Sequence, residues 1–493
     1  MKRASGILLP VFSLPSEYGI GDFGKSAYSF VDKLKASAQS YWQILPLGQT
    51  GFGDSPYQSF SSFAGNPYFV SPETLCERGC LKKSELTDYA VSPSNSKIDY
   101  SALHSTRYKL LRTAFSRFEK NTDYEDFCDE NLYWLNDYAL FMSLKDAFGG
   151  IPVSMWEREI RLRYPEAVKS AKEQLSESVD FYKFIQYEFF SQWKSLCGYA
   201  HKNGIEIIGD IPIYVAPDSA DVWSHPSHFE LDDDLRPVNV AGCPPDSFSK
   251  DGQLWGNPLY DWQEHKRSGF RWWIKRLEHC FKLYDIVRID HFRGFDEYYS
   301  IPADSKNARQ GRWRKAPGIA LFRTVESILG EKRIIAEDLG FVTDSVRKLV
   351  ADCGFPNMKI LQFAFDSRDD SSSEHIPHKY HKNCVCYTGT HDNHTLLSWY
   401  DDITKKERRA VREYLCDGFT PDEKLPLTLV AIAMRSIADT CIIPMQDWLC
   451  LSDDARINIP STLGNNWRWR MGENDFSDGL CKRIKTLTKL CGR

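Results

Sequence analysis

The chain contains eight short apolar runs that each end abruptly at polar or glycine residues, and this pattern constrains its fold more than any other feature. The runs are ILLPVFSL (7–14), YWQILPL (41–47), IEIIGDIPIYV (205–215), YDIVRID (284–290), RIIAED (333–338), MKILQFAF (358–365), CVCYTG (384–389) and CIIPMQDW (441–448). Most are too short for helices and rich in isoleucine, valine and aromatic residues, which predicts buried strands. Helical patterns separate many of them, so we expect parallel strands with right-handed crossovers. Eight such strands favour a closed (β/α)8 TIM barrel, an α/β fold, over an open sheet.

The predicted helices and the long gaps between strands define the expected domain organisation. Helical patterns occupy residues 24–38, 107–120, 135–147, 261–283, 319–329, 343–353 and 405–415. Residues 48–204 are too long for a simple connection and predict a large, mostly helical insertion after the second strand. Residues 216–262 are rich in proline and glycine, and they predict a loop-rich insertion of lid and substrate loops after the third strand. We therefore expect residues 1–493 to form a single barrel domain with these two inserted subdomains.

Composition excludes several classes of protein. The 62 Lys and Arg residues against 67 Asp and Glu residues give a net charge of −5, which argues against binding a nucleic-acid backbone. No apolar stretch approaches the roughly 18 residues of a membrane span. The apolar run at 6–14 follows Lys2 and Arg3 as in a signal peptide, but Pro10 interrupts it. The 14 cysteines are scattered and several lie in apolar runs, so we expect reduced thiols in a cytoplasmic protein.

Ionisable residues lie within, close or follow four of the predicted strands, and Asp210 is the one that lies within its strand. They are Asp210, Arg288, Asp290, Glu337, Asp338, His391 and Asp392. The active site of an α/β barrel lies at the C-terminal ends of its strands, where these groups would converge. One strand-end aspartate could simply cap the next helix, but recurrence at four strands favours a catalytic site.

Spacing suggests different ionisation states for two of these carboxyl groups. Arg288 and Asp290 are two residues apart on a strand and share a face, so the arginine should hold the aspartate ionised, as a nucleophile requires. Glu337 follows an apolar approach, Ile334 to Ala336, which could raise its pKa and let it donate a proton to a leaving oxygen. Two carboxyl groups with opposed environments are what retaining glycoside chemistry needs.

Six segments carry a resemblance to a known family. They are SYWQILPLGQTGFGDSPYQSFSSFAGNPYFV (40–70), GDIPIYVAPDSADVW (209–223), GCPPDSFSKDGQLWGNP (242–258), RIDHFRGF (288–295), AEDLG (336–340) and GTHDN (389–393). On these motifs the chain resembles the 4-α-glucanotransferases of the amylomaltase and disproportionating-enzyme type, relatives of the α-amylases. The resemblance runs essentially from end to end.

The resemblance implies roles for particular residues. Asp290 matches the nucleophile, Glu337 the general acid/base, and Asp392 the third carboxylate, which grips sugar hydroxyls and stabilises the transition state. The implied substrate-binding residues are Tyr57, Asp210, Trp255, Arg288, His391 and Asn458. Tyr57 would stack on the sugar that becomes covalently attached, and the loop 242–258 with Trp255 resembles the family's flexible lid.

The resemblance also implies the reaction. Glu337 would protonate the glycosidic oxygen while Asp290 attacks the anomeric carbon, and a sugar 4-hydroxyl rather than water would then accept the glucan. The implied partners are α-1,4-glucans and malto-oligosaccharides, with glucose as acceptor, in starch and glycogen metabolism. We expect no metal, no cofactor, no nucleic-acid or membrane partner, and a monomer or weak homodimer.

Two rival functions stay open at this point. One is an α-amylase-like hydrolase that uses the same carboxyl groups, and the other is a glucan-binding protein without catalysis.

Two apparent binding motifs in the sequence carry less weight. GIGDFG (19–24) fits a dinucleotide fingerprint but has no acidic residue about 20 positions on, and His375, His378 and His381 lie in a polar segment typical of a solvated loop.

Overall fold

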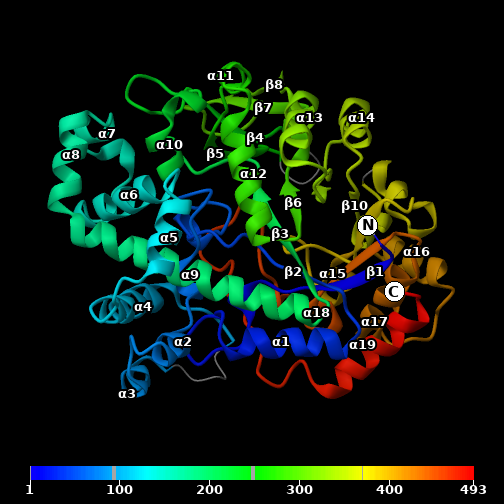
Figure 1. Cartoon of the computed structure of the whole chain (residues 1–493). Helices are drawn as coiled ribbons and strands as arrows, with labels where there is room; N and C mark the ends of the chain where they lie inside the picture. Colours follow the sequence, from blue (N-terminus) through cyan, green and yellow to red (C-terminus); the bar gives the residue numbers. More distant parts are fainter. Residues whose placement is uncertain (1, 91–95, 246–249, 369) are drawn as a thin grey trace.

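The eight apolar runs form a closed parallel barrel. The computed structural model describes residues 2–90, 96–245, 250–368 and 370–493. Around the barrel the strands follow one another in the order β1 (Ala4–Leu8), β12 (Thr440–Pro444), β11 (Cys384–Tyr387), β10 (Asn357–Ile360), β9 (Ile334–Ala336), β6 (Ile286–Asp290), β3 (Glu206–Pro212) and β2 (Tyr41–Gln43). Each described pairing between neighbours is parallel. The predicted TIM barrel is confirmed, and Figure 1 shows its strands surrounded by helices.

Several predicted boundaries need correction. β1 begins at Ala4 and ends at Leu8, and the rest of the run 7–14 turns away as a short 3-10 helix at Val11–Ser13 after Pro10. The predicted helix 261–283 is two helices, α11 (Trp262–Arg267) and α12 (Arg271–Leu283). Gly269 and Phe270 between them both have left-handed backbone angles, φ 64° and 57°. Left-handed residues cannot continue a right-handed helix, so the chain turns there.

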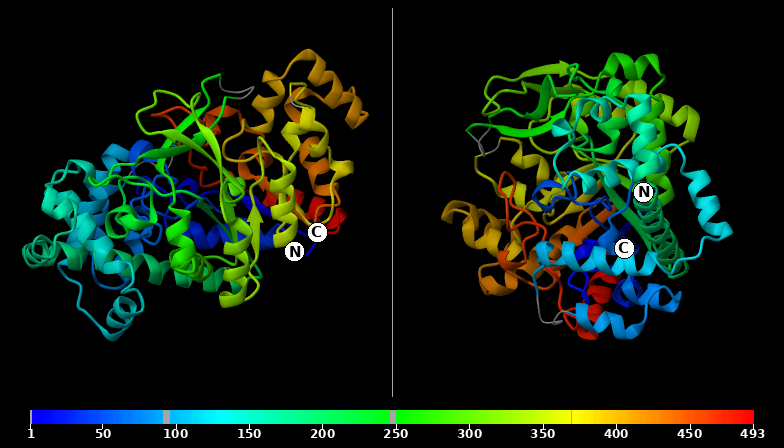
Figure 2. Two further views of the ribbon diagram at one scale, coloured as in Figure 1. Left: turned by 90° about the horizontal axis from the view of Figure 1, so that it is seen from above. Right: turned by 90° about the vertical axis from the view of Figure 1, so that its left-hand side faces the viewer.

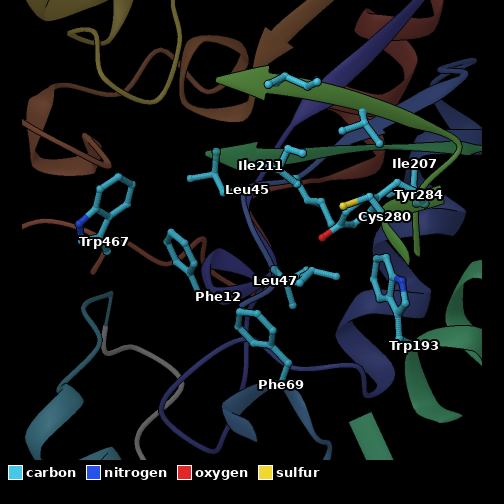
Figure 3. Close-up of a cluster of buried hydrophobic side chains, with 14 of the residues drawn as sticks. Phe12, Leu45, Leu47, Phe69, Trp193, Ile207, Ile211, Cys280, Tyr284 and Trp467 are labelled. Carbon is cyan, nitrogen blue, oxygen red and sulfur yellow. The ribbon is translucent and has the colours of Figure 1, made fainter. Parts of the chain in front are cut away.

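The alternation of side chains along the strands divides the core into two layers. Ile208, Ile286, Ile335, Met358 and Val385 belong to one cluster, which fills the barrel interior. Their strand neighbours point the other way and belong to the outer cluster beneath the helices. Figure 3 shows part of this outer layer, where Ile207 and Ile211 of β3 lie near Tyr284 and Cys280. A residue's position in the alternation therefore decides whether it reaches the barrel interior or the helices.

Helices cover the barrel and extend to one side of it. The insertion 48–204 contains α2 (Pro72–Glu77), α3 (Lys83–Leu86), α4 (Tyr100–Phe115), α5 (Thr122–Glu130), α6 (Leu135–Ala147), α7 (Arg158–Arg161), α8 (Pro165–Gln174) and α9 (Ser176–Lys202). α9 packs against β3 and against α1 (Lys25–Ala36), so its C-terminal part completes the outer layer of the barrel. The remaining helices are α10 (Ala220–Ser224), α13 (Gly318–Leu329), α14 (Asp344–Cys353), α15 (Leu396–Asp402), α16 (Lys405–Leu415), α17 (Leu425–Arg435), α18 (Met445–Trp448) and α19 (Asp478–Leu490). The division into one domain with two inserted subdomains stays a prediction.

A second, antiparallel sheet lies above the barrel strands in the view of Figure 1. Its strands follow the order β5 (Gln253–Pro258), β4 (Asn239–Cys243), β7 (Glu297–Pro302) and β8 (Arg312–Lys315). The sequence interpretation of 216–262 as loops missed β4 and β5. β5 is mostly half-exposed and contains Gly256 at φ 77°, so it lacks the apolar pattern of a strand.

The two termini lie side by side at the barrel wall in both views of Figure 2. The Arg493 Nη1 atom donates to the carbonyl of Ala4 at 3.0 Å, which ties the end of the chain to the first strand. Within the described ranges, no helix is long and apolar enough to cross a membrane.

Candidate active site

Side-chain alternation directs four of the predicted site residues into the mouth of the barrel. Asp210 has the same parity on β3 as the interior residue Ile208, and Arg288 and Asp290 have that of Ile286 on β6. Asp210 and Arg288 are also register partners on neighbouring strands. Glu337 comes directly after β9 with the parity of interior Ile335. Asp338 has the opposite parity and accepts hydrogen bonds from Asn357 and from the backbone N–H of Met358, away from the mouth.

Arg288 holds two of these carboxylates at once. Its Nη1 donates to Asp210 Oδ2 at 2.5 Å, and its Nη2 donates to Asp290 Oδ1 at 2.9 Å. The Tyr57 hydroxyl also donates to Asp210 Oδ2, at 2.8 Å. Arg288 is 3% exposed and Asp210 is fully buried. Buried charges need partners of this kind, and the planar guanidinium can serve two carboxylates in fixed directions.

The environment of Asp290 differs in one respect from the sequence interpretation. Burial raises the pKa of Asp290 to about 6, and this effect outweighs the lowering by Arg288, while Asp210 and Asp392 raise it further. The arginine therefore keeps Asp290 ionised at neutral pH, as expected, but does not hold its pKa below the ordinary range. Its side chain remains 30% exposed, so one part faces the open mouth.

Glu337 has the raised pKa that its apolar approach predicts. Burial, followed by the charge of Asp290, raises the pKa of Glu337 to about 8. Its two oxygens accept hydrogen bonds from the backbone N–H groups of His291, at 2.6 Å, and Leu339, at 2.8 Å. These bonds fix the orientation of the carboxyl group. Glu337 is therefore protonated near neutral pH beside an ionised Asp290, as a proton donor beside a nucleophile must be.

Asp392 approaches the same mouth from the loop after β11. Asn458 Nδ2 donates to Asp392 Oδ1 at 2.6 Å, and His391 Nε2 lies 3.3 Å from that oxygen. The Tyr57 ring stacks on the His391 ring with centroids 5.3 Å apart. Since the charges of Asp210 and Asp392 both act on Asp290, the predicted polar residues form one electrostatic cluster.

Trp255 borders the cluster from the antiparallel sheet. Its ring lies 4.7 Å, edge to face, from the ring of His291, the residue next to Asp290. Its Nε1 donates to Gln253 Oε1, so both ends of the side chain are anchored. The predicted lid 242–258 includes β5 and Trp255, but its residues 246–249 lie outside the described part of the chain.

Three further residues belong to the site that the sequence reasoning did not single out. His291 adopts a left-handed backbone with φ 54°, which turns its N–H toward Glu337. Arg456 Nη2 donates to the carbonyl of Asp392 at 2.7 Å, and Trp467 lies 5.8 Å from both the Tyr57 and the His391 rings. A left-handed histidine and contacts across more than 60 residues leave no local pattern that could have revealed them.

The two weaker motifs serve structural roles. Asp22 of GIGDFG accepts a hydrogen bond from the Gly24 N–H just before α1, and β1 ends well before this segment. His375 Nδ1 accepts from the Ile360 N–H, and His378 stacks on Tyr414. Among the residues that the structure describes, no group of His, Cys, Asp and Glu side chains is arranged to hold a metal ion.

Comparisons with known proteins agree with this geometry. A family profile described as 4-alpha-glucanotransferase matches residues 9–474. A 4-alpha-glucanotransferase of Clostridium butyricum is 47% identical over 98% of this chain and 99% of its own length. One from Streptococcus pneumoniae is 46% identical over 100% of this chain and 98% of its own. The structure of the amylomaltase from Streptococcus agalactiae in complex with acarbose matches with a TM-score of 0.95 and 40% identity, covering 100% of both chains.

Proposed function

Because the chain belongs to the 4-alpha-glucanotransferase family, we propose that its three clustered carboxyl groups move α-1,4-linked glucan segments by a retaining double displacement. The protein is a 4-alpha-glucanotransferase of class EC 2.4.1.25.

In the first step Glu337 donates its proton to the glycosidic oxygen while Asp290 attacks the anomeric carbon. The bond between sugar and leaving oxygen breaks, and a covalent bond between the sugar and Asp290 forms through an oxocarbenium-like transition state. Arg288 supports this step because its hydrogen bond keeps the Asp290 oxygens directed into the mouth. Asp392, held by Asn458, grips the sugar hydroxyls as positive charge develops on the ring.

In the second step the released glucan end is replaced by an acceptor. The 4-hydroxyl of another glucan or of glucose attacks the covalent intermediate, Glu337 takes its proton, and Asp290 leaves with the α-1,4 linkage restored. A sugar competes well against water when the site offers aromatic surfaces and excludes solvent. Tyr57 and Trp255 supply aromatic rings at the mouth.

One arrangement carries the proposal: Arg288 donates to Asp290, while burial and the charge of Asp290 raise the pKa of Glu337 and favour its protonated form. The pKa of Glu337 is raised to about 8 and that of Asp290 only to about 6, so both are in the required state near pH 7. The substrate class, α-1,4-glucans and malto-oligosaccharides, draws support from the related amylomaltase structure with acarbose. We also propose a cytoplasmic location, which the 14 free cysteines support, six of them buried.

Turnover of maltotriose tests the proposal. We expect free glucose and a ladder of longer oligomers with little gain in reducing ends, whereas a hydrolase would raise reducing ends with each cleavage. Asp290→Ala should lower the rate by about 10³-fold or more while glucan binding persists. Unchanged turnover in this variant would refute the assignment of Asp290, and a protein that binds glucan but never turns it over would be a lectin.

A further inference from the structure

Asp392, at the edge of the catalytic mouth, also borders a cavity that reaches outside the barrel wall. This cavity has a volume of about 1320 Å³, and Asp392, Leu339 and Lys359 of β10 are among the residues that line it. Met358 and Ile360 fill the barrel interior, so Lys359 between them points to the opposite face of the strand. We call the outer part, bordered by Asn357, Lys359, Glu374 and His381, the side groove.

Lys359 is mostly buried in the side groove, and among the described residues its Nζ atom has no hydrogen-bond partner. It is 8% exposed, and the carboxylate oxygen with which it pairs, Glu374 Oε2, is 3.8 Å from its Nζ, too far for a hydrogen bond. The other oxygen of Glu374 is already taken by Arg347 Nη2 at 2.9 Å. An ammonium group that keeps only this long ion pair gains free energy from any ligand oxygen that comes within hydrogen-bond distance.

The groove offers acceptors as well as donors. Asn357 Oδ1 is buried and has no hydrogen-bond partner in the described structure, while its Nδ2 donates to Asp338. The cations Lys359 and Arg347 are matched by the carboxyl groups of Glu374 and Asp338, so the lining has little net charge. Phe355 adds an apolar surface. A neutral polyol, whose hydroxyls donate and accept and whose ring has apolar faces, matches this lining better than an anion does.

We propose that the side groove binds a glucose unit of a long glucan whose other units occupy the catalytic mouth, with Lys359 Nζ donating to a sugar hydroxyl. This inference rests on the proposed function. The side groove belongs to the same cavity that Asp392 borders, so one glucan chain occupies both the side groove and the catalytic mouth. The side groove then favours long glucans over short ones. Short donors that lie across the catalytic carboxyl groups do not reach Lys359.

The test compares kcat/KM for maltotriose and for maltoheptaose and amylose in Lys359→Met, which removes the ammonium group and keeps the chain length. We expect kcat/KM for the long glucans to fall about tenfold, the loss of one charge-assisted hydrogen bond. The value for maltotriose should change less than twofold. Lys348→Met on the neighbouring α14, where the lysine side chain is 73% exposed, is the matched control and should alter neither value.

Other outcomes are decisive in the opposite direction. An equal loss on short and long substrates, or no loss on either, overturns the proposal. The proposal is also overturned if inorganic phosphate raises the melting temperature of the wild type but not of Lys359→Met, since the side groove would then be an anion site.

Should Lys359→Met not fold, His381→Ala at the exposed rim takes its place. The expected result is a selective loss of about threefold in kcat/KM on long glucans. Absence of chain-length selectivity in that variant equally overturns the proposal, whereas inactivity of the wild-type enzyme on maltotriose would refute the proposed function instead.

Discussion

Replacing Arg288 by lysine should move the acid limb of the pH–rate profile. Arg288 bonds Asp210 and Asp290 through two separate nitrogens. Lysine has a shorter side chain with one compact ammonium group, and it cannot bond both carboxylates in the directions that the two guanidinium nitrogens provide. We expect it to stay with the fully buried Asp210, where an unpaired carboxylate would be most costly, and to release Asp290.

The size of the shift follows from the lost contact. A hydrogen bond to a charged group contributes about 1.5–3 kcal/mol, and one pKa unit corresponds to about 1.4 kcal/mol. The pKa of Asp290, about 6 in the native protein, should therefore rise by about 1–2 units. Because the nucleophile must be ionised, a raised pKa lowers the reactive fraction at pH 7, from about nine-tenths to between about a half and a tenth.

The assay is kcat/KM for glucose release from maltotriose between pH 4 and pH 9. The acid limb should move to higher pH while the alkaline limb, set by Glu337, stays in place, so the bell narrows. Arg333→Lys is the control, since Arg333 also bonds a carboxylate through two nitrogens, but on the exposed surface and at the other end of the barrel. A uniform loss of rate with an unmoved acid limb would show that Arg288 does not govern the ionisation of Asp290.

Three further changes have defined outcomes. In Glu337→Gln the rate of glucan transfer should collapse. The melting temperature of this variant should exceed that of the wild type by a margin that grows as pH increases from 5 to 9. The native pKa of about 8 lies above that of a free glutamate, so protonation of Glu337 stabilises the wild-type fold, and this contribution is lost as pH rises through 8. A melting-temperature difference that does not grow with pH contradicts this reasoning. Arg456→Met should lower kcat by about 10–100-fold with little change in KM, because it releases the backbone of Asp392, and an effect confined to KM would oppose a positioning role. Deleting Arg493, whose guanidinium bonds the carbonyls of Ala4 and Ser436, should lower the apparent melting temperature by about 2–3 °C at unchanged kcat/KM; an unaltered melting curve would show that this contact does not secure the barrel.

Much of the barrel could be predicted from the sequence because its strands are buried on both faces. A two-sided strand such as Ile286–Asp290 reads as a continuous apolar run, and the polar residue that ends it marks the mouth. Strands β5 and β8 of the antiparallel sheet were missed because they are partly exposed, and β5 also carries a left-handed glycine. The break between α11 and α12 was missed because Phe270, an apolar residue in an apolar pattern, takes a left-handed conformation.

The sequence alone determined the barrel, the residues at its strand ends and the family, since all three follow from local patterns of residue type. The sequence also indicated a protonated Glu337 and an ionised Asp290, but only the tertiary structure showed that the pKa of Asp290 is raised as well. Asp290 and Glu337 both have raised pKa values because burial opposes charge, and the difference between them depends on which one Arg288 touches. Tertiary structure also placed Lys359 and Asp392 on the lining of one cavity. The contacts and distances between remote segments depend on how those segments pack, and a local pattern of residues does not contain them.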